Sequence, residues 1–286
     1  MSLGNLNALE TSACPLCKST EMSVRHIFGP FRVVSCRVCG LAYLSPRLRE
    51  SSMRAAYENA GYFATEGDIG YADYRDQEHS LRITFRRFLE ELKRQDMTNG
   101  RLLEIGSGYG FFLAEAEEFF SYVCGLELSP EAVAHAQNLS GATIYPQDVK
   151  SLPPEVKDFD VIVAINVIEH IYDPVDFVLH IKKRLKKAGK IIIATPDIGS
   201  FWYKIMGRKW PSFKVPEHVA FYTSKTLALL LERSGCGNIK PVSFPHAFPL
   251  ELITRQFRIH LEGKFSKIPI WIPKTMLALS AESHGE

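Results

Sequence analysis

Apolar and polar positions between residues 77 and 245 alternate in blocks that predict helices and strands in turn. From Gln77 to Lys93 apolar residues recur near helical period, and Asn99-Gly100 marks the end of this predicted amphipathic helix. Short apolar runs predict strands over residues 101–105, 122–127, 143–145, 161–165, 191–195 and 239–244. Helices are expected between them, starting near Phe111, Pro130, Pro174 and Ser224. This alternation predicts an α/β fold with a doubly wound, mostly parallel sheet.

Three further segments surround this predicted domain of residues 77–245. Residues 1–46 carry two strand patterns around Gly29-Pro30, and residues 47–76 form a polar, tyrosine-containing stretch that predicts a linker or lid. Residues 246–286 have a pattern that predicts a helical, partly apolar C-terminal extension. Within it, the apolar run Ile268–Leu279 is too short to span a bilayer. Two alternatives remain for this run: it packs on the domain, or it makes peripheral contact with a membrane surface.

Composition and charge narrow the class of protein without identifying a function. The 286 residues are 46% hydrophobic and 23% charged, which is typical of a globular chain with one full-sized domain and a small appendage. A net charge of +2 gives no reason to expect nucleic acid or an acidic membrane as the default partner. The N-terminal segment lacks the basic and then apolar pattern of a signal peptide, so a cytoplasmic location is expected.

Four of the six cysteines form two C-x-x-C pairs, Cys14 with Cys17 and Cys36 with Cys39. Two such pairs, separated by a predicted hairpin, can place four thiolates around one tetrahedral zinc ion. A redox or disulfide pair is the alternative, but a reducing compartment favours the metal. A closed four-thiolate site offers no open position to a substrate, so residues 1–46 predict a structural zinc ribbon.

A glycine-rich turn follows the first strand of the predicted sheet. Gly106, Gly108 and Gly110 are spaced one residue more tightly than in the dinucleotide fingerprint G-x-G-x-x-G, and no lysine of a triphosphate-binding loop follows them. In a doubly wound sheet, such a turn lets a ligand approach the backbone beyond the carboxyl ends of the strands.

Three acidic residues are expected to lie close to the ligand that this turn would bind. Glu104 precedes the glycines, Glu127 ends the next strand and suits both hydroxyls of a ribose, and Asp148 follows the third strand, where it can accept from an adenine amine. Carboxylates would repel a pyrophosphate but attract a sulfonium and an ammonium group. The pattern therefore predicts S-adenosylmethionine (SAM) as the ligand.

With these motifs in place, the chain resembles the class I SAM-dependent methyltransferases from Leu81 to about Phe244. LEIGSGYG resembles the glycine motif, GLELSPEAV the ribose-acid motif, and FDVIVAINVIEHIYDP the fourth-strand motif. The stretch Lys209–Gly235 is similar to segments of members that act on sugars, lipids and quinones, and a four-cysteine segment also precedes such domains near sugar C-methyltransferases. The resemblance implies SAM bound by the glycine loop, Glu127 and Asp148. Contacts to the cofactor are expected from Glu104, Gly106, Ser107, Gly108, Gly110, Glu127, Leu128, Asp148, Val149, Asn166 and Tyr74.

Two features depart from this resemblance. Quinone-type O-methyltransferases often carry a carboxylate three residues before the Glu-His pair, where this chain has Asn166, and this argues against a catalytic metal. The fold also expects a seventh, antiparallel strand near the C-terminus, and the pattern after Phe244 does not predict one.

Methyl transfer needs an aligned nucleophile and, when that nucleophile carries a proton, a base. The candidates are His170, with Glu169 before it at the carboxyl edge of the sheet, and His218 in the segment expected to cover the substrate. Glu169 is expected to raise the pKa of His170, although the pair could instead fix the loop over SAM. Trp210 and Phe213 are candidate residues of the acceptor pocket, with core packing as the alternative.

Three functions fit these motifs. The first is methyl transfer to a small molecule such as a sugar nucleotide, a saccharide or a lipid-linked intermediate. The second is an RNA methyltransferase that uses the ribbon to bind RNA, although the basic residues of the ribbon are few and thinly spread. The third is a scaffold that binds SAM or a partner without catalysis.

Overall fold

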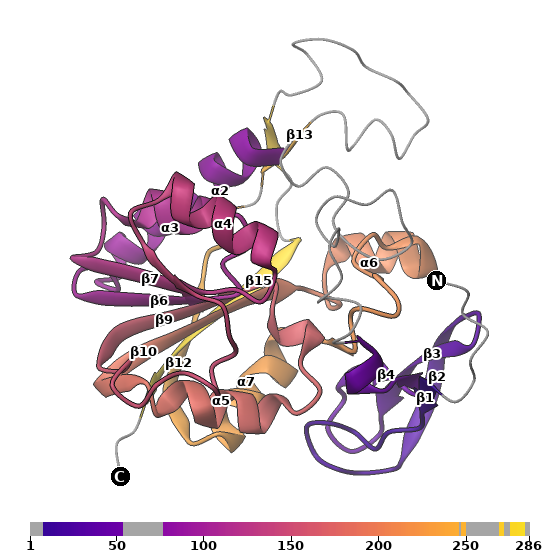
Figure 1. The fold of residues 1–286 in the computed structure, drawn as a ribbon. Coiled ribbons are helices and arrows are strands. Elements are labelled where there is room, and N and C mark those ends of the chain that lie inside the picture. The colour runs from indigo at the N-terminus through magenta and orange to yellow at the C-terminus, as the bar shows by residue number, and fades with distance from the viewer. Residues whose placement is uncertain (1–7, 54–76, 246, 250–268, 272–274, 284–286) are drawn as a thin grey trace.

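A seven-stranded sheet forms the centre of the protein, as a computed structural model of residues 8–53, 77–245, 247–249, 269–271 and 275–283 describes it (Figure 1). The strand order is β12-β15-β10-β9-β6-β7-β8. The pairs β7–β8, β6–β7, β6–β9 and β9–β10 are parallel, whereas β15 is antiparallel to both β10 and β12. The predicted doubly wound, mostly parallel sheet is confirmed. Its strands are β6 (Arg101–Ile105), β7 (Tyr122–Leu126), β8 (Thr143–Tyr145), β9 (Phe159–Ile165), β10 (Leu185–Pro196), β12 (Cys236–Val242) and β15 (Met276–Ser283).

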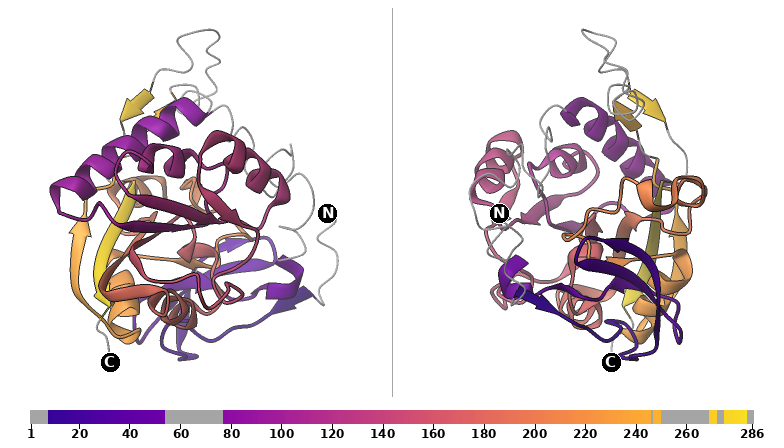
Figure 2. Two further views of the ribbon diagram at one scale, coloured as in Figure 1. Left: turned by 60° about the vertical axis from the view of Figure 1, so that its left-hand side comes forward. Right: turned by 90° about the vertical axis from the view of Figure 1, so that its right-hand side faces the viewer.

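Helices cover both faces of the sheet (Figures 1 and 2). One face packs against α2 (Glu78–Arg94), α3 (Phe111–Ala116) and α4 (Pro130–Leu139), and the other against α5 (Pro174–Lys182) and α7 (Ser224–Arg233). Successive side chains of a strand point to opposite faces, so a strand buried on both sides is apolar at every position. Residues 161–165 of β9 and 191–194 of β10 follow this rule, and alternate residues of each enter the two separate cores.

The C-terminal strand β15 overturns the predicted helical extension of residues 246–286. Leu277 and Leu279 pack into the core on the α5–α7 side, and Ala278 packs into the core on the opposite face. A short apolar run does not distinguish a buried strand from a helix by its periodicity, and the open position between β10 and β12 selects the strand. Because residues 277–279 are buried, this part of the run 268–279 is also excluded from the predicted contact with a membrane surface.

The cysteine-containing segment forms a four-stranded sheet of order β11-β4-β3-β2. Its strands are β2 (Met22–Phe28), β3 (Phe31–Cys36) and β4 (Ala42–Leu44), and the fourth, β11 (Ala220–Phe221), comes from the methyltransferase-like part of the chain. The predicted hairpin around residues 29–30 is present. The short strand β1 (Leu9–Glu10) pairs with β5 (Arg47–Leu48), so the predicted linker of residues 47–76 begins too early. Residues 54–76, with Tyr71 and Tyr74, lie outside the described residues.

The remaining elements are short. They are η3 (Ile168–His170), α6 (Phe201–Met206), η4 (Gly207–Lys209), and the antiparallel pair β13 (Ala247–Pro249) and β14 (Pro269–Trp271). Among the helices described, none has both the length and the apolar character needed to cross a bilayer.

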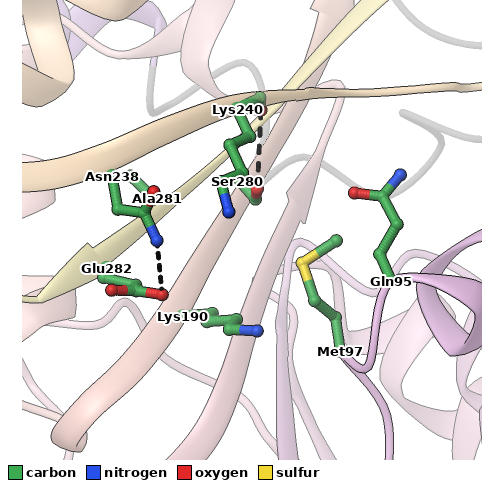
Figure 3. Close-up of a pocket in the computed structure, with 8 residues that line it drawn as sticks. All are labelled: Gln95, Met97, Lys190, Asn238, Lys240, Ser280, Ala281 and Glu282. Carbon is green, nitrogen blue, oxygen red and sulfur yellow. Dashed lines mark hydrogen bonds between the residues drawn. The ribbon is translucent and has the colours of Figure 1, made fainter.

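A small cavity of about 270 Å³ lies between the end of α2 and strands β10, β12 and β15 (Figure 3). Polar side chains dominate its wall: Asn238 Nδ2 donates to Glu282 Oε1 at 2.8 Å, and Ser280 Oγ donates to the carbonyl of Lys240. The cavity is near the amino ends of the parallel strands, whereas ligands of this architecture bind beyond the carboxyl ends.

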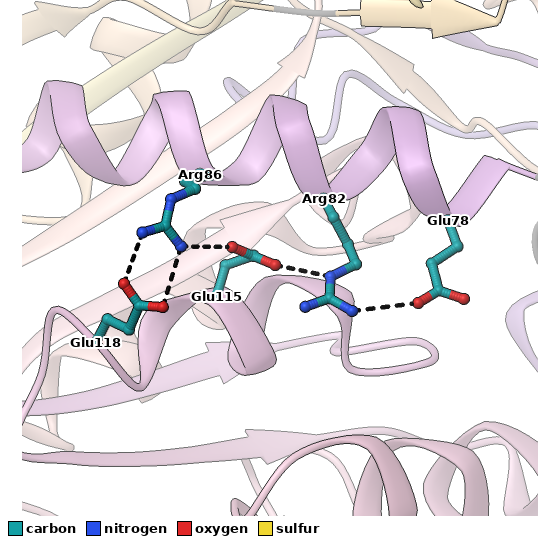
Figure 4. A network of polar contacts seen from close by, with 5 residues as sticks. All are labelled: Glu78, Arg82, Arg86, Glu115 and Glu118. Atoms are coloured by element: carbon teal, nitrogen blue, oxygen red, sulfur yellow. Dashed lines mark hydrogen bonds and ion pairs between the residues drawn. The ribbon is translucent and has the colours of Figure 1, made fainter. Parts of the chain in front are cut away.

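Paired charges join α2 to α3 (Figure 4). Arg82 Nε donates to Glu115 Oε1 at 2.7 Å, and Arg86 Nη1 donates to Glu115 Oε2 at 3.1 Å. Arg86 also contacts Glu118, and Arg82 also contacts Glu78. The side chain of Glu115 is only 8% exposed, so the two arginines neutralise a carboxylate that the interface largely removes from water.

Candidate functional site

A cavity of about 930 Å³ opens at the carboxyl ends of β6, β7, β8 and β9. The loops after these four strands form one part of its wall, and η3, α6 and residues 210–218 form another. This is the edge at which doubly wound sheets bind ligands. The cavity is therefore the candidate active site.

The glycine turn after β6 is tightly packed and conformationally special. Gly106 and Gly110 have φ values of 73° and 81°, in the left-handed region that favours glycine. A Cβ atom at Gly106 would lie 2.7 Å from Cγ2 of Val167, and one at Gly110 would lie 2.8 Å from Cβ of Ala136. Two of the glycines are thus required by the turn itself.

Glu127 directly follows β7 and holds the loops around it in place. Its Oε2 accepts from the backbone N–H of Gly108 at 2.8 Å, and its Oε1 accepts from those of Leu128 and Ser129 at 2.7 and 2.8 Å. Burial raises the pKa of the carboxyl, although these backbone hydrogen bonds act in the opposite direction. Glu127 therefore links the glycine turn to the loop after β7.

Glu104, at the end of β6, is a buried acid without a hydrogen bond to its Oε2 among the described residues. Burial and the nearby charge of Glu127 raise its pKa well above the ordinary range. The hydroxyl of Ser107, three residues later, is likewise buried without a partner in the described structure. Buried polar atoms are normally hydrogen-bonded, so these two groups are suited to a polar ligand in the cavity.

The other predicted cofactor residues also line the cavity. Asp148 Oδ1 accepts from the N–H groups of Lys150 and Ser151 and so closes the turn after β8. Asn166 has a left-handed backbone, with a φ value of 55°. The predicted positions that the structure brings together around the cavity are Glu104, Gly106, Ser107, Gly108, Glu127, Leu128, Asp148, Val149 and Asn166. Gly110 supports the turn from behind, against Ala136 of α4.

Glu169, His170 and His218 meet at the opposite part of the cavity wall. The two imidazole rings have centroids 4.7 Å apart, although the residues are 48 positions apart in the chain. Nδ1 of His170 lies 3.2 Å from the carbonyl oxygen of Glu217, and Nδ1 of His218 lies 2.9 Å from that of Ser212. Because a carbonyl only accepts, each Nδ1 carries the proton and each Nε2 keeps its lone pair. Glu169 Oε2 accepts from Thr195 Oγ1 at 2.9 Å.

The pKa values of this cluster contradict the expectation for His170. Burial and the charge of Lys214 lower the pKa of His170 to about 3, whereas Glu169 was expected to raise it. Burial lowers the pKa of His218 well below its ordinary value, and the charges of His170 and Lys214 act in the same direction. Burial raises the pKa of Glu169 to about 7. Desolvation, reinforced by the charge of Lys214, thus lowers the pKa of both rings, and both imidazoles are neutral.

Lys214 is a cavity residue that the sequence analysis missed. It lines the cavity beside His218, and burial lowers the pKa of its ammonium group. Its position four residues before His218 is the one signal that could have pointed to it. The ligand atoms of Glu169, His170 and His218 lie within 4.8 Å of one another and could in principle hold a metal ion. The charge of Lys214 on the same cluster opposes a second cation there.

The two candidate pocket aromatics have different positions. Trp210 is buried and lines the cavity together with Trp202 of α6. Phe213 is not in the wall of the cavity and packs against Phe28 of the hairpin and Phe221 of β11. Of the two alternatives for Phe213, the structure therefore supports core packing, in the apolar cluster of the four-stranded sheet.

The four paired cysteines form one cluster on the ribbon. Cys14 Sγ lies 3.5 Å from Cys39 Sγ, and Cys17 Sγ lies 3.4 Å from Cys36 Sγ. All four sulfur atoms lie within 4.8 Å of one another. A zinc ion with Zn–S bonds of about 2.3 Å requires sulfur atoms about 3.8 Å apart in a tetrahedron, and the cluster fits this requirement. Although burial raises the pKa of Cys36, hydrogen bonds from the Cys39 amide, the Cys17 thiol and the Val38 amide lower it to about 7.

Comparison with known proteins assigns the chain to a family. A family model described as "Methyltransferase domain" matches residues 74–240. An uncharacterised protein of Methanocaldococcus jannaschii is 30% identical over 55% of this chain and 74% of its own length. A ubiquinone biosynthesis O-methyltransferase of Cereibacter sphaeroides is 29% identical over 56% of this chain and 70% of its own length. A tRNA U34 carboxymethyltransferase of Colwellia psychrerythraea is 27% identical over 52% of this chain, which spans about half (48%) of that relative.

Solved structures agree with the fold. A SAM-dependent methyltransferase of Archaeoglobus fulgidus matches with a TM-score of 0.52 at 19% identity, over 74% of this chain and 96% of its own. A magnesium protoporphyrin IX methyltransferase of Synechocystis, solved with bound S-adenosylhomocysteine (SAH), matches with a TM-score of 0.52 at 12% identity, over 82% of this chain and all (100%) of its own. With the strand order and the family model in agreement, the chain belongs to the methyltransferase domain family, and it is a class I SAM-dependent methyltransferase.

Proposed function

We propose that this protein transfers a methyl group from SAM to a small-molecule acceptor held in the cavity of about 930 Å³. One observation carries the proposal: a single cavity joins the glycine turn and its acids to the cluster of Glu169, His170 and His218. The first group suits the donor, and the second suits an acceptor that must lose a proton.

The donor half of the proposed site consists of three acids and the glycine turn. Glu127 can bind the ribose hydroxyls, and Asp148 can accept from the adenine amine, as in the related fold. The ammonium group of the methionine moiety is the natural partner of Glu104, whose Oε2 is buried and without a hydrogen bond in the described structure. An ammonium there would stabilise the ionised form of Glu104, which burial disfavours.

The acceptor half of the proposed site supplies the base. A lone pair on the acceptor attacks the methyl carbon in line with the breaking S–C bond, and SAH leaves. The acceptor proton passes to Nε2 of His218 or His170, since both nitrogens carry a lone pair. Glu169 lies beside both rings and would stabilise the imidazolium that forms.

The preferred acceptors are a sugar nucleotide, a saccharide or a lipid-linked intermediate. Trp202 and Trp210 give the cavity flat apolar surface, while Lys214 and the histidines give it polar contacts. RNA is the second candidate, because one relative is a tRNA carboxymethyltransferase. The exposed Lys18 of the ribbon pairs with Asp173, which reduces the free positive charge available for RNA.

We also infer that Cys14, Cys17, Cys36 and Cys39 bind a structural zinc ion, since their distances and closed arrangement fit tetrahedral thiolate coordination. All four ligands come from the ribbon, so the metal would stabilise this segment and take no part in the reaction.

Calorimetry with SAH and transfer of tritium from methyl-labelled SAM test the proposed function. Binding of SAH is expected, with label entering the small-molecule fraction of a cell extract. His218→Gln should lower the rate of transfer but still bind SAH, and the double variant that also carries His170→Gln should lose transfer altogether. His180→Gln on α5 is the matched control, and it should keep both SAH binding and transfer. Absence of SAH binding would overturn the proposal, label in RNA would favour the second candidate, and binding without any transfer would indicate a scaffold.

A further inference from the structure

The ribbon and the acceptor half of the cavity share a backbone connection at Val219. The N–H of Val219 donates to the carbonyl of Glu169 at 2.8 Å, and its own carbonyl accepts from the N–H of Leu44 at 2.9 Å. Leu44 ends β4 of the ribbon, and Val219 directly follows His218. One residue thus joins the ribbon, the histidine and the glutamate of the proposed acceptor site.

The strand β11 extends this connection. Ala220 and Phe221 pair with Tyr43 and Ala42 of β4, so the segment after His218 is an edge strand of the ribbon sheet. Side chains reinforce the pairing on both faces: Phe221 packs in a cluster with Ala42 and Leu44, while Ala220 packs in the other core with Tyr43. The backbone after His218 is therefore held by the ribbon on one side and by Glu169 and Ile198 on the other.

The cysteine pairs lead directly into β4. Cys36 ends β3, and its N–H donates to the carbonyl of Leu41 at 2.9 Å, while the N–H of Gly40 donates to the carbonyl of Cys36 at 3.0 Å. Cys39 lies three residues before the first residue of β4. The position of β4 consequently depends on how the second cysteine pair is held.

The donor half of the cavity is built differently. The glycine turn, Glu127 and Asp148 follow β6, β7 and β8, whose backbone pairing lies within the large sheet. One face of β6 and β7 packs against helices α2 to α4, and the other belongs to the same apolar core as Leu41 and Tyr43 of the ribbon. Figure 1 shows the ribbon at the side of the molecule where α6 lies, away from α3 and α4. Among the described residues, the ribbon forms no backbone hydrogen bond with these three strands or the loops after them, so loss of order in the ribbon should largely spare the cofactor contacts.

We propose that the four-cysteine ribbon is a positioning element of the acceptor half of the site. A metal ion held by Cys14, Cys17, Cys36 and Cys39 fixes β4, β4 fixes β11, and β11 keeps the imidazole of His218 beside Glu169 and His170. The proposal rests on the proposed function for the role of His218. It divides the site into a donor half that is independent of this metal and an acceptor half that requires it.

Imidazole ¹⁵N NMR of His218, metal content and SAH affinity test this division on the full chain. In the native protein His218 should show the neutral tautomer protonated at Nδ1, identified by loss of its signals in His218→Gln. Cys39→Ser should lose the ion and the defined tautomer of His218, while the dissociation constant of SAH changes by less than about threefold. Cys39→His can restore a three-cysteine, one-histidine site and should restore the signals of His218.

Cys236→Ser is the matched control, because Cys236 is buried in β12 outside the ribbon and should affect neither the metal nor His218. Unchanged signals of His218 in metal-free Cys39→Ser would overturn the proposal. So would a parallel loss of SAH binding, because the metal would then support the whole fold. Absence of SAH binding in the native protein would instead contradict the proposed function.

Discussion

Replacement of Glu104 by glutamine should stabilise the protein and weaken cofactor binding at the same time. The carboxyl is buried, its Oε2 has no hydrogen bond among the described residues, and burial and Glu127 raise its pKa. A carboxyl whose pKa is raised on folding contributes stability at acidic pH and loses that contribution as the pH rises. Glu104→Gln removes the buried charge and keeps the shape of the side chain.

The expected size follows from proton linkage: above both pKa values, each tenfold weakening of the Glu104 acid on folding costs about 1.4 kcal/mol. A cost of about 1–3 kcal/mol is therefore expected, and the neutral amide avoids it. Glu104→Gln should raise the free energy of unfolding by about this amount at pH 8, and by about zero near pH 4, where the native carboxyl is protonated. If Glu104 pairs with the ammonium of SAH, the loss of a charged hydrogen bond should weaken SAH binding about 10- to 150-fold.

Urea denaturation at the two pH values and calorimetry with SAH measure both effects. Glu115→Gln is a matched control, because Glu115 is also a largely buried glutamate but has two arginine partners (Figure 4). It should lose about 1 kcal/mol of stability and leave SAH binding unchanged. A Glu104→Gln protein that is less stable than the native protein at pH 8, or that binds SAH equally well, would refute the reasoning.

Further changes test other parts of the structure. Tyr222→Phe removes a buried hydroxyl that has no hydrogen-bond partner among the described residues, so the stability in urea should be unchanged or should rise by up to about 1 kcal/mol; a clear loss would reveal a partner. Gly110→Ala should destabilise the protein by more than about 2 kcal/mol because its Cβ meets Ala136, whereas Gly29→Ala, with open space around it, should cost only about 1 kcal/mol. The lowered pKa values of His170 and His218 predict imidazole ¹⁵N shifts that stay constant from pH 8 to pH 6, and a midpoint near 6.5 in either would contradict the burial argument.

Local sequence patterns predicted most of the fold because most of its strands and helices are marked locally. The first five strands in the methyltransferase part and the helices after Pro130 and Pro174 carry apolar runs, turns and N-terminal prolines that need no tertiary context. Strand β15 has no such marks, since only the open position between β10 and β12 distinguishes its apolar run from a helix.

In the candidate site, too, local patterns predicted some contacts, whereas others depend on tertiary structure. The glycine turn and its acids follow the ends of recognisable strands, so their meeting could be predicted. The contact of His170 with His218 joins residues that are far apart in the chain, through the loop before β11, and the sequence gives no sign of the pairing of β11 with β4. The expected pKa of His170 was wrong because burial, which a single sequence does not reveal, lowers it together with the charge of Lys214.

The place of β15 in the sheet also constrains the order of folding during synthesis. β12 has β15 as its neighbour in the sheet, and β15 in turn separates β12 from β10. A ribosome-bound chain that has exposed everything up to β12 therefore has an unpaired edge on β10 and a strand with no partner. Chains of this kind present a template for intermolecular pairing until β15 emerges. Protection of the nascent chain should therefore matter most between the emergence of β12 and that of β15.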